Sequence, residues 1–370
     1  MKSINYGQQS ISQSDVNEVV NVLKSDFLTQ GPKVAEFEQD LANYCSAKYA
    51  KAISNGTAAL HLAYLAVGLK SGDTVWTTPN TFVATANAAL YCGAKVDFVD
   101  IDSKTYNMSI NSLRLKLIQA KKDNKLPKLV VPVHFAGQSC EMKDIWLLSK
   151  EYGFKVVEDA CHALGSEYLN SKVGSCKYSD MAVFSFHPVK MITTGEGGAV
   201  LTNNKGLNKK VALLMNHGIT KDASQFKNKS DGDWYYEQQV LGFNYRLTDI
   251  QAALGISQLK RLDSFVKKRR EIAGRYLNEL KNVILPYQHP DTNSSWHLFV
   301  IQVNDRKIVH QRLKVNNILT QVHYIPVNEQ PFYTRKELQN SNTFYQYCLS
   351  LPIYVDLIEL EQMEVVRLLG

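Results

Sequence analysis

The sequence of 370 residues predicts an α/β fold, with a large domain built on a mostly parallel sheet between helices and a smaller α+β domain after it. Short runs rich in Val alternate with helical stretches through the first two thirds of the chain, and several are apolar on both faces, as in a parallel sheet covered by helices. From about Asp249 the apolar residues change to helical spacing. We therefore expect a large domain at residues 1–248, and a long linking helix with a small C-terminal domain at residues 249–370.

The large domain is expected to contain six strands, because six runs are short, apolar and rich in β-branched or aromatic residues. They lie at residues 74–77, 95–99, 129–133, 155–157, 181–186 and 198–201. Helices are expected before the first strand at residues 57–69 and between the third and fourth strands at residues 142–152. Residues 249–280 have a helical pattern throughout and no Pro, so they predict one long helix or two in series. Strands of the small domain are predicted at residues 296–303 and 318–324.

The charge balance is mildly basic, with 42 Lys and Arg against 35 Asp and Glu and a net charge of +7. Scattered lysines are usually solvated surface, so we expect no nucleic-acid partner, whereas a weak positive field suits an anionic small molecule. The uncharged run at residues 53–69 is too short and polar to cross a membrane. The six cysteines are scattered and form no CxxC pair, which favours a cytoplasmic protein without a metal site.

The pair Gly56-Thr57 lies where the helix predicted at residues 57–69 begins. The first turn of a helix offers free N–H groups and the positive end of the helix dipole, and Thr57 adds a hydroxyl. Gly56 and Thr57 are therefore a good binding site for a phosphate. An ordinary helix cap at Thr57 is the simpler explanation of this segment taken alone.

Two carboxylates, Glu158 and Asp159, follow a buried strand. Ligands of open α/β sheets bind at the carboxyl ends of the strands, and a carboxylate buried there needs a cation or hydrogen-bond donors to stay ionised. An exposed turn between strand and helix explains the pair equally well. Because side chains alternate along a strand, we expect Glu158 to point away from Asp159.

Lys190 follows the strand at residues 181–186, between Pro188 and a Gly-rich turn. A lone lysine is most often a surface charge, whereas a lysine with apolar neighbours is suited to act as an amine nucleophile. Together the three segments supply a phosphate site, a carboxylate and an amine, which are the parts that pyridoxal phosphate requires. The sequence has no GxGxxG, GxxxxGK[ST] or HExxH motif, which disfavours a dinucleotide, a P-loop and a metal.

Several motifs resemble those of the DegT-type sugar aminotransferases, a pyridoxal-phosphate family of fold type I, and the resemblance runs almost end to end. The motifs lie at residues 27–32, 55–60, 158–160, 185–190, 242–249, 322–326 and 351–354. Residues 217–222 and 234–238 are similar to the subgroup that makes UDP-4-amino-4,6-dideoxy-N-acetyl-beta-L-altrosamine in pseudaminic acid biosynthesis. This subgroup implies transfer of an amino group from L-glutamate to C4 of a 4-keto-6-deoxy UDP-N-acetylhexosamine.

The resemblance also implies a role for each cofactor-binding residue. Lys190 is the Schiff-base lysine and moves the proton, while Asp159 keeps the ring nitrogen of pyridoxal phosphate protonated. Phe82 stacks on the ring, and His162 lies near its phenolic oxygen. The phosphate is implied to bind Gly56, Thr57, Ser185 and Asn244.

A second implied set of residues binds the nucleotide sugar. Its members are Tyr6, Asp26, Phe27, Leu28, Thr29, His323, Tyr324, Ile325 and Pro326. Structural roles explain these residues too, since residues 29–32 also suit a turn. The family further implies a homodimer with shared active sites, in which Asn244 reaches the phosphate in the neighbouring subunit, although Asn244 is also explained as a turn residue.

Three alternatives remain open. A sugar 3-dehydratase of the same family would lack the Schiff-base lysine, so Lys190 argues against it. A regulator that binds pyridoxal phosphate without catalysis would keep the phosphate site and need no amino donor. An aminotransferase for another 4-keto nucleotide sugar, such as the one in bacillosamine synthesis, differs in sugar stereochemistry, which the sequence does not determine.

Overall fold

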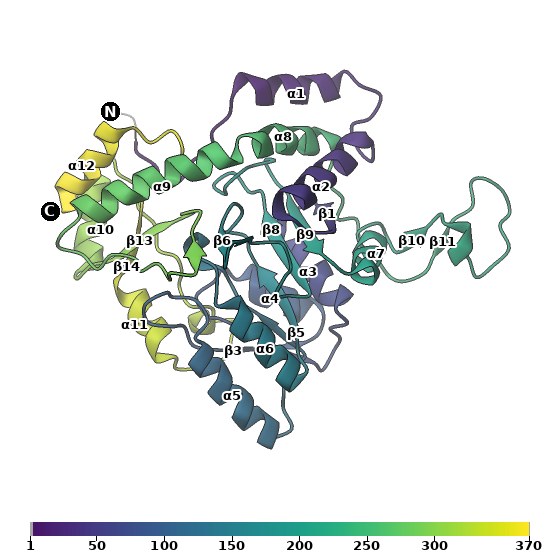
Figure 1. The fold of residues 1–370 in the computed structure, drawn as a ribbon, viewed down its shortest axis with the longest axis horizontal. Coiled ribbons are helices and arrows are strands. Elements are labelled where there is room, and N and C mark those ends of the chain that lie inside the picture. The colour runs from purple at the N-terminus through teal and green to yellow at the C-terminus, as the bar shows by residue number, and fades with distance from the viewer. Residues whose placement is uncertain (1–2, 370) are drawn as a thin grey trace.

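The computed structural model describes residues 3–369 and is built around a seven-stranded sheet (Figure 1). The strands lie in the order β1-β9-β8-β5-β4-β2-β3. Their bounds are Tyr49–Ile53 (β1), Thr74–Thr77 (β2), Lys95–Phe98 (β3), Leu129–Val131 (β4), Lys155–Asp159 (β5), Met181–Ser185 (β8) and Gly198–Thr202 (β9). The strands from β3 to β8 are parallel, whereas β9 is antiparallel to both β8 and β1. The mostly parallel sheet predicted from the sequence is therefore confirmed.

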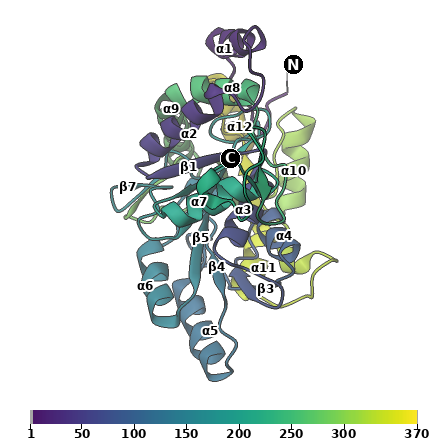
Figure 2. The same cartoon turned by 90° about the vertical axis from the view of Figure 1, so that its right-hand side faces the viewer.

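Helices cover both faces of the sheet, with α5 and α6 on one side and α4 on the other (Figure 2). Val157 belongs to a core that includes residues of α3 and α4, while its neighbour Val156 belongs to a core with α5 and α6. Strands that are buried on both faces need apolar residues at successive positions. The helices are α1 (Gln13–Leu23), α2 (Pro32–Cys45), α3 (Gly56–Ala66), α4 (Ala84–Tyr91), α5 (Ile110–Lys122), α6 (Met142–Tyr152), α7 (Lys205–Leu214), α8 (Asp249–Lys260), α9 (Leu262–Glu279), α10 (Arg306–Val315), α11 (Gln339–Tyr347) and α12 (Glu359–Leu369).

The C-terminal part has a core of its own around the antiparallel pair β13 (Phe299–Gln302) and β14 (Cys348–Leu351). Residues of α9 and α12 complete this core, and so does Ile4 from the start of the chain. Helix α8 packs on α1 and α2 instead, so α8 and α9 in series connect the two parts (Figure 1). The domain boundary at residue 248 stays a prediction.

Short strands also pair outside the seven-stranded sheet. β12 (Thr292–Asn293) pairs with β6 (Glu167–Tyr168), which also pairs with β7 (Ser171–Lys172). The hairpin of β10 (Ile219–Thr220) and β11 (Glu237–Gln238) extends away from the body of the molecule (Figure 1). None of the helices within residues 3–369 is both long enough and apolar enough to cross a membrane.

The predicted helices and strands are confirmed within three residues at each end, except for the strand predicted at residues 318–324. The helical run that begins at Asp249 is two helices in series, which meet at Arg261. The strand predicted at residues 318–324 is wrong, because only Ile318 and Gln321 make isolated bridges, with different partners. Beyond Gln321 the chain turns toward the large domain instead of following β14. The sequence prediction also missed β1, which pairs through β9 alone at the edge of the sheet.

Candidate active site

A cavity of about 960 Å³ lies where β5 and β8 end and α3 begins. Eleven predicted site residues line it: Tyr6, Gly56, Thr57, Phe82, Asp159, His162, Ser185, Lys190, His323, Tyr324 and Ile325. Six others lie outside its lining: Asp26, Phe27, Leu28, Thr29, Asn244 and Pro326. The fold therefore brings the phosphate site, the carboxylate and the lysine of the sequence together in one cavity.

The start of α3 forms the phosphate site. Asn55 caps this helix, because its Oδ1 accepts the N–H of Ala58 at 2.8 Å. Thr57 is therefore the second residue of the helix, and the explanation of Thr57 as an ordinary cap is wrong. A Cβ at Gly56 would lie 2.9 Å from the Cβ of Ser185, so glycine allows the helix and the end of β8 to approach closely. First-turn N–H groups and two hydroxyls thus line one corner of the cavity.

Asp159 is the last residue of β5 and is 5% exposed. Its Oδ2 accepts the hydroxyl of Thr85 at 2.6 Å, and its Oδ1 accepts the N–H of Cys161 at 3.2 Å. An exposed turn is therefore the wrong explanation for this residue. Hydrogen bonds of this kind favour the charged form of a buried carboxylate, which suits Asp159 to face a protonated nitrogen.

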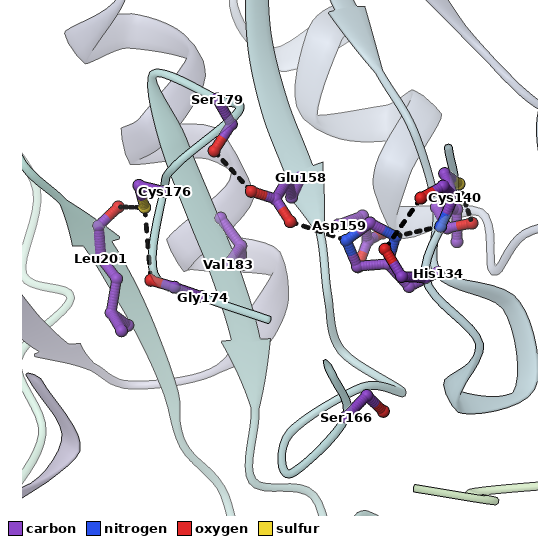
Figure 3. A network of polar contacts seen from close by, with 12 residues as sticks. His134, Cys140, Glu158, Asp159, Ser166, Gly174, Cys176, Ser179, Val183 and Leu201 are labelled. Carbon is purple, nitrogen blue, oxygen red and sulfur yellow. Dashed lines mark hydrogen bonds and ion pairs between the residues drawn. The ribbon is translucent and has the colours of Figure 1, made fainter. Parts of the chain in front are cut away.

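Glu158 points away from the cavity, as its position next to Asp159 predicts. Its carboxylate accepts the hydroxyl of Ser179 at 2.5 Å and the Nε2–H of His134 at 2.7 Å (Figure 3). The Nδ1 atom of His134 accepts the backbone N–H of Cys140 at 3.1 Å, which leaves the ring proton on Nε2. The hydrogen bond to His134 links the segment after β4 to β5, so Glu158 has a structural role.

Lys190 lies in the turn after β8, where its backbone N–H donates to the carbonyl of His187 at 2.8 Å. Burial lowers the pKa of the Lys190 amine, and the negative charge of Asp159 offsets part of this effect. A lowered pKa enlarges the neutral fraction of the amine. Only the neutral form attacks a carbonyl carbon or accepts a proton, so the cavity prepares Lys190 for both steps.

Three buried histidines, His162, His297 and His323, lie around the cavity and are neutral at pH 7. Burial lowers the pKa of each, and the positive charge of Lys190 lowers it further. His162 uses Nδ1 to accept a backbone N–H at 3.3 Å, so its Nε2–H donates to the Tyr324 hydroxyl at 3.0 Å. Neutral imidazoles thus add hydrogen-bond donors to the cavity without adding charge.

The pKa of His323 predicts a loss of stability in acid. Burial lowers this pKa to about 3, whereas an unfolded histidine binds a proton near pH 6.5. Between about pH 6.5 and pH 5 the unfolded state therefore binds more protons, and His323 alone should cost about 1.5 kcal/mol of stability. Urea unfolding of the cofactor-free protein at both pH values measures this loss. His323→Gln should lose about 1.5 kcal/mol less over the same interval, and equal losses in the two proteins would contradict the assignment.

The cavity lining includes further residues that the sequence prediction did not assign to the site, among them Thr81, Thr85 and His297. The available signal for the threonines was their spacing of four residues around Phe82, which places two hydroxyls on one side of a helical turn. No local signal points to His297. It reaches the cavity from the segment before β13, more than 100 residues after Asp159 in the chain.

These residues fit pyridoxal phosphate. The first turn of α3 and the Ser185 hydroxyl line a corner of the cavity that suits a phosphate, the buried Asp159 carboxylate suits the ring nitrogen, and Lys190 supplies the amine. When bound, this cofactor supplies an electron-withdrawing ring that stabilises negative charge beside the amino group being transferred.

Comparisons with known proteins agree with this site. The model of the DegT/DnrJ/EryC1/StrS aminotransferase family matches residues 9–369. The UDP-4-amino-4,6-dideoxy-N-acetyl-beta-L-altrosamine transaminase of Campylobacter jejuni (strain 81-176) is 41% identical over 370 residues, which cover 96% of this chain and 93% of that protein.

Two solved structures are similar over their whole length. PseC of Helicobacter pylori, an aminotransferase involved in the biosynthesis of pseudoaminic acid, has a TM-score of 0.91 and 32% identity over 100% of this chain and 98% of its own. Spr1654 of Streptococcus pneumoniae in its PLP form has a TM-score of 0.88 and 26% identity over 99% of this chain and 97% of its own. The chain therefore belongs to the DegT/DnrJ/EryC1/StrS aminotransferase family and is a pyridoxal-phosphate-dependent aminotransferase of fold type I.

Proposed function

We propose that this aminotransferase moves the amino group of L-glutamate to C4 of a 4-keto-6-deoxy UDP-N-acetylhexosamine. The product is UDP-4-amino-4,6-dideoxy-N-acetyl-beta-L-altrosamine, an intermediate of pseudaminic acid biosynthesis. The observation that carries this proposal is full-length similarity, at 36–41% identity, to transaminases of Campylobacter jejuni and Helicobacter pylori with that name. The mildly basic charge of the chain suits an anionic nucleotide sugar.

Six cavity residues have a role in this proposal. Gly56, Thr57 and Ser185 bind the cofactor phosphate, and Asp159 faces the ring nitrogen. The Nζ atom of Lys190 takes a proton from one carbon of the reacting molecule and delivers it to another, because its neutral form is accessible. Phe82 is 59% exposed although it is apolar, which supports a role as the flat surface against which the ring stacks.

The positions of the predicted site residues outside the cavity support the proposal of a homodimer. Leu28 and Thr29 make backbone contacts with the start of α8, so residues 26–29 run beside the segment that contains Asn244. Residues 26–29 and Asn244 are exposed. We propose that this surface, residues 26–29 with Asn244, completes the cavity of a partner subunit in a homodimer.

Exposed apolar side chains support the same assembly. Phe27 and Leu28 are 53% and 47% exposed, and Trp234 on the extended hairpin is 73% exposed. Phe27 and Leu28 are neighbours in the chain, and exposed apolar side chains that lie together mark an interaction site. We further propose that the protein works in the cytoplasm, which the six free cysteines support, because such thiols persist in a reducing compartment.

Product analysis by NMR tests the proposed substrate. The enzyme is incubated with ¹⁵N-labelled L-glutamate and, in separate reactions, the 4-keto UDP-sugars of the pseudaminic acid and bacillosamine pathways. We expect ¹⁵N at C4 of the altrosamine product, at least ten-fold faster than in the other reaction. A preference for the bacillosamine-type substrate would contradict the proposal and assign the enzyme to that alternative.

A further inference from the structure

Two threonine hydroxyls form a chain that ends at Asp159. Thr85 Oγ1 lies 2.6 Å from Asp159 Oδ2, and Thr81 Oγ1 lies 2.7 Å from Thr85 Oγ1. The two threonines are 1% and 2% exposed, and both line the cavity. Tyr64 donates its phenol proton to the carbonyl of Thr85 at 3.0 Å, so the backbone that carries the hydroxyl is held as well.

The direction of these hydrogen bonds follows from counting protons. Each threonine hydroxyl has one proton to donate, and an ionised carboxylate has none. When Asp159 is charged, Thr85 must therefore donate to Asp159, and Thr81 must donate to Thr85. Both hydroxyls then stabilise the charged carboxylate, the first directly and the second by making Thr85 a stronger donor.

We propose that Thr85, supported by Thr81, is a positioning residue that holds the Asp159 carboxylate charged and oriented toward the cofactor's ring nitrogen. The inference rests on the proposed role of Asp159. A buried carboxylate with too few donors drifts toward its neutral form or rotates away. In either case the nitrogen would lose the charge that keeps it protonated, and the ring would withdraw electrons less well.

A matched set of variants tests this inference. Thr85→Val removes the hydroxyl and keeps the shape, and Thr85→Ser returns the hydroxyl. Thr77→Val is the control, because Thr77 is also fully buried but donates to the carbonyl of Val131, away from the cavity. The holoenzymes are prepared with pyridoxal phosphate labelled with ¹⁵N at the ring nitrogen. The ¹⁵N chemical shift then reports protonation of the nitrogen, and kcat with L-glutamate is measured beside it.

We expect Thr85→Val to move the ¹⁵N signal toward the unprotonated position and to lower kcat about 10- to 100-fold, the effect of one hydrogen bond to a charged group. Thr85→Ser should restore both readouts, and Thr77→Val should leave both unchanged. Thr81→Val should cause a smaller change in the same direction, and it replaces Thr85→Val if that variant does not fold.

Asp159→Asn separates the two ways in which the inference fails. If Asp159→Asn moves the ¹⁵N signal and Thr85→Val does not, Thr85 has no positioning role and the proposed role of Asp159 stands. If neither variant moves the signal, the assignment of Asp159 to the ring nitrogen is overturned, and the inference about Thr85 falls with it. A loss of kcat in Thr85→Val without a shift of the signal would also overturn the positioning role.

Discussion

Replacing Lys190 with alanine should abolish turnover while leaving a folded protein that still binds the cofactor. The amine of Lys190 lines the cavity, and burial lowers its pKa, so it is the group suited to carry the proton. Gly56, Thr57 and Ser185 would still bind the phosphate in the variant. Turnover is measured with L-glutamate alone and with the keto sugar, and retained cofactor is measured by absorbance. Lys190→Arg should also be inactive, because a guanidinium does not deprotonate at neutral pH.

Lys116 provides a matched control for this experiment. Burial lowers the pKa of its amine to about 8, but Lys116 pairs with Asp97 at 2.6 Å and lies outside the cavity lining. Lys116→Ala should keep its turnover. Reduction of the wild-type holoenzyme with borohydride, followed by peptide mapping, should place the pyridoxyl adduct on Lys190. An adduct on another lysine, or turnover in Lys190→Ala, would overturn the assignment.

Mixing two inactive variants should restore activity if Asn244 serves the partner subunit. Lys190→Ala lacks the amine, and Asn244→Asp places a negative charge beside the phosphate. In a mixed dimer, one site combines an intact Lys190 with the partner's intact Asn244, and the other site has both defects. Random mixing gives about half mixed dimers with one good site each, so about a quarter of wild-type activity is expected.

Subunit exchange must be demonstrated in the same sample, for example by mass spectrometry of differently tagged chains. No recovery of activity after confirmed exchange would place Asn244 in its own subunit's site or outside any site. Activity of the Asn244→Asp protein alone would show that this residue does not bind the phosphate. The exposed position of Asn244, outside its own chain's cavity, makes the recovery the expected result.

Local patterns in the sequence determined much of the fold and the identity of the central residues. Runs of apolar residues predicted β2 and α6 with their bounds, because strand and helix periods depend on neighbours a few residues apart. The alternation of side chains along β5 predicted that Glu158 and Asp159 face opposite ways. Lys190, Asp159 and the Gly56-Thr57 pair were recognised as chemical groups because each follows a strand or begins a helix.

Features that depend on contacts between distant segments could be determined only from the tertiary structure. Residues 318–324 have the composition of a strand, yet their partners and the cavity, not their own pattern, decide their path. Thr85 is separated from Asp159 by 74 residues, so its hydrogen bond exists only because α4 and β5 meet in the fold. A sequence pattern records what each residue offers locally, whereas the burial and pairing of charged groups arise from which segments fold against each other.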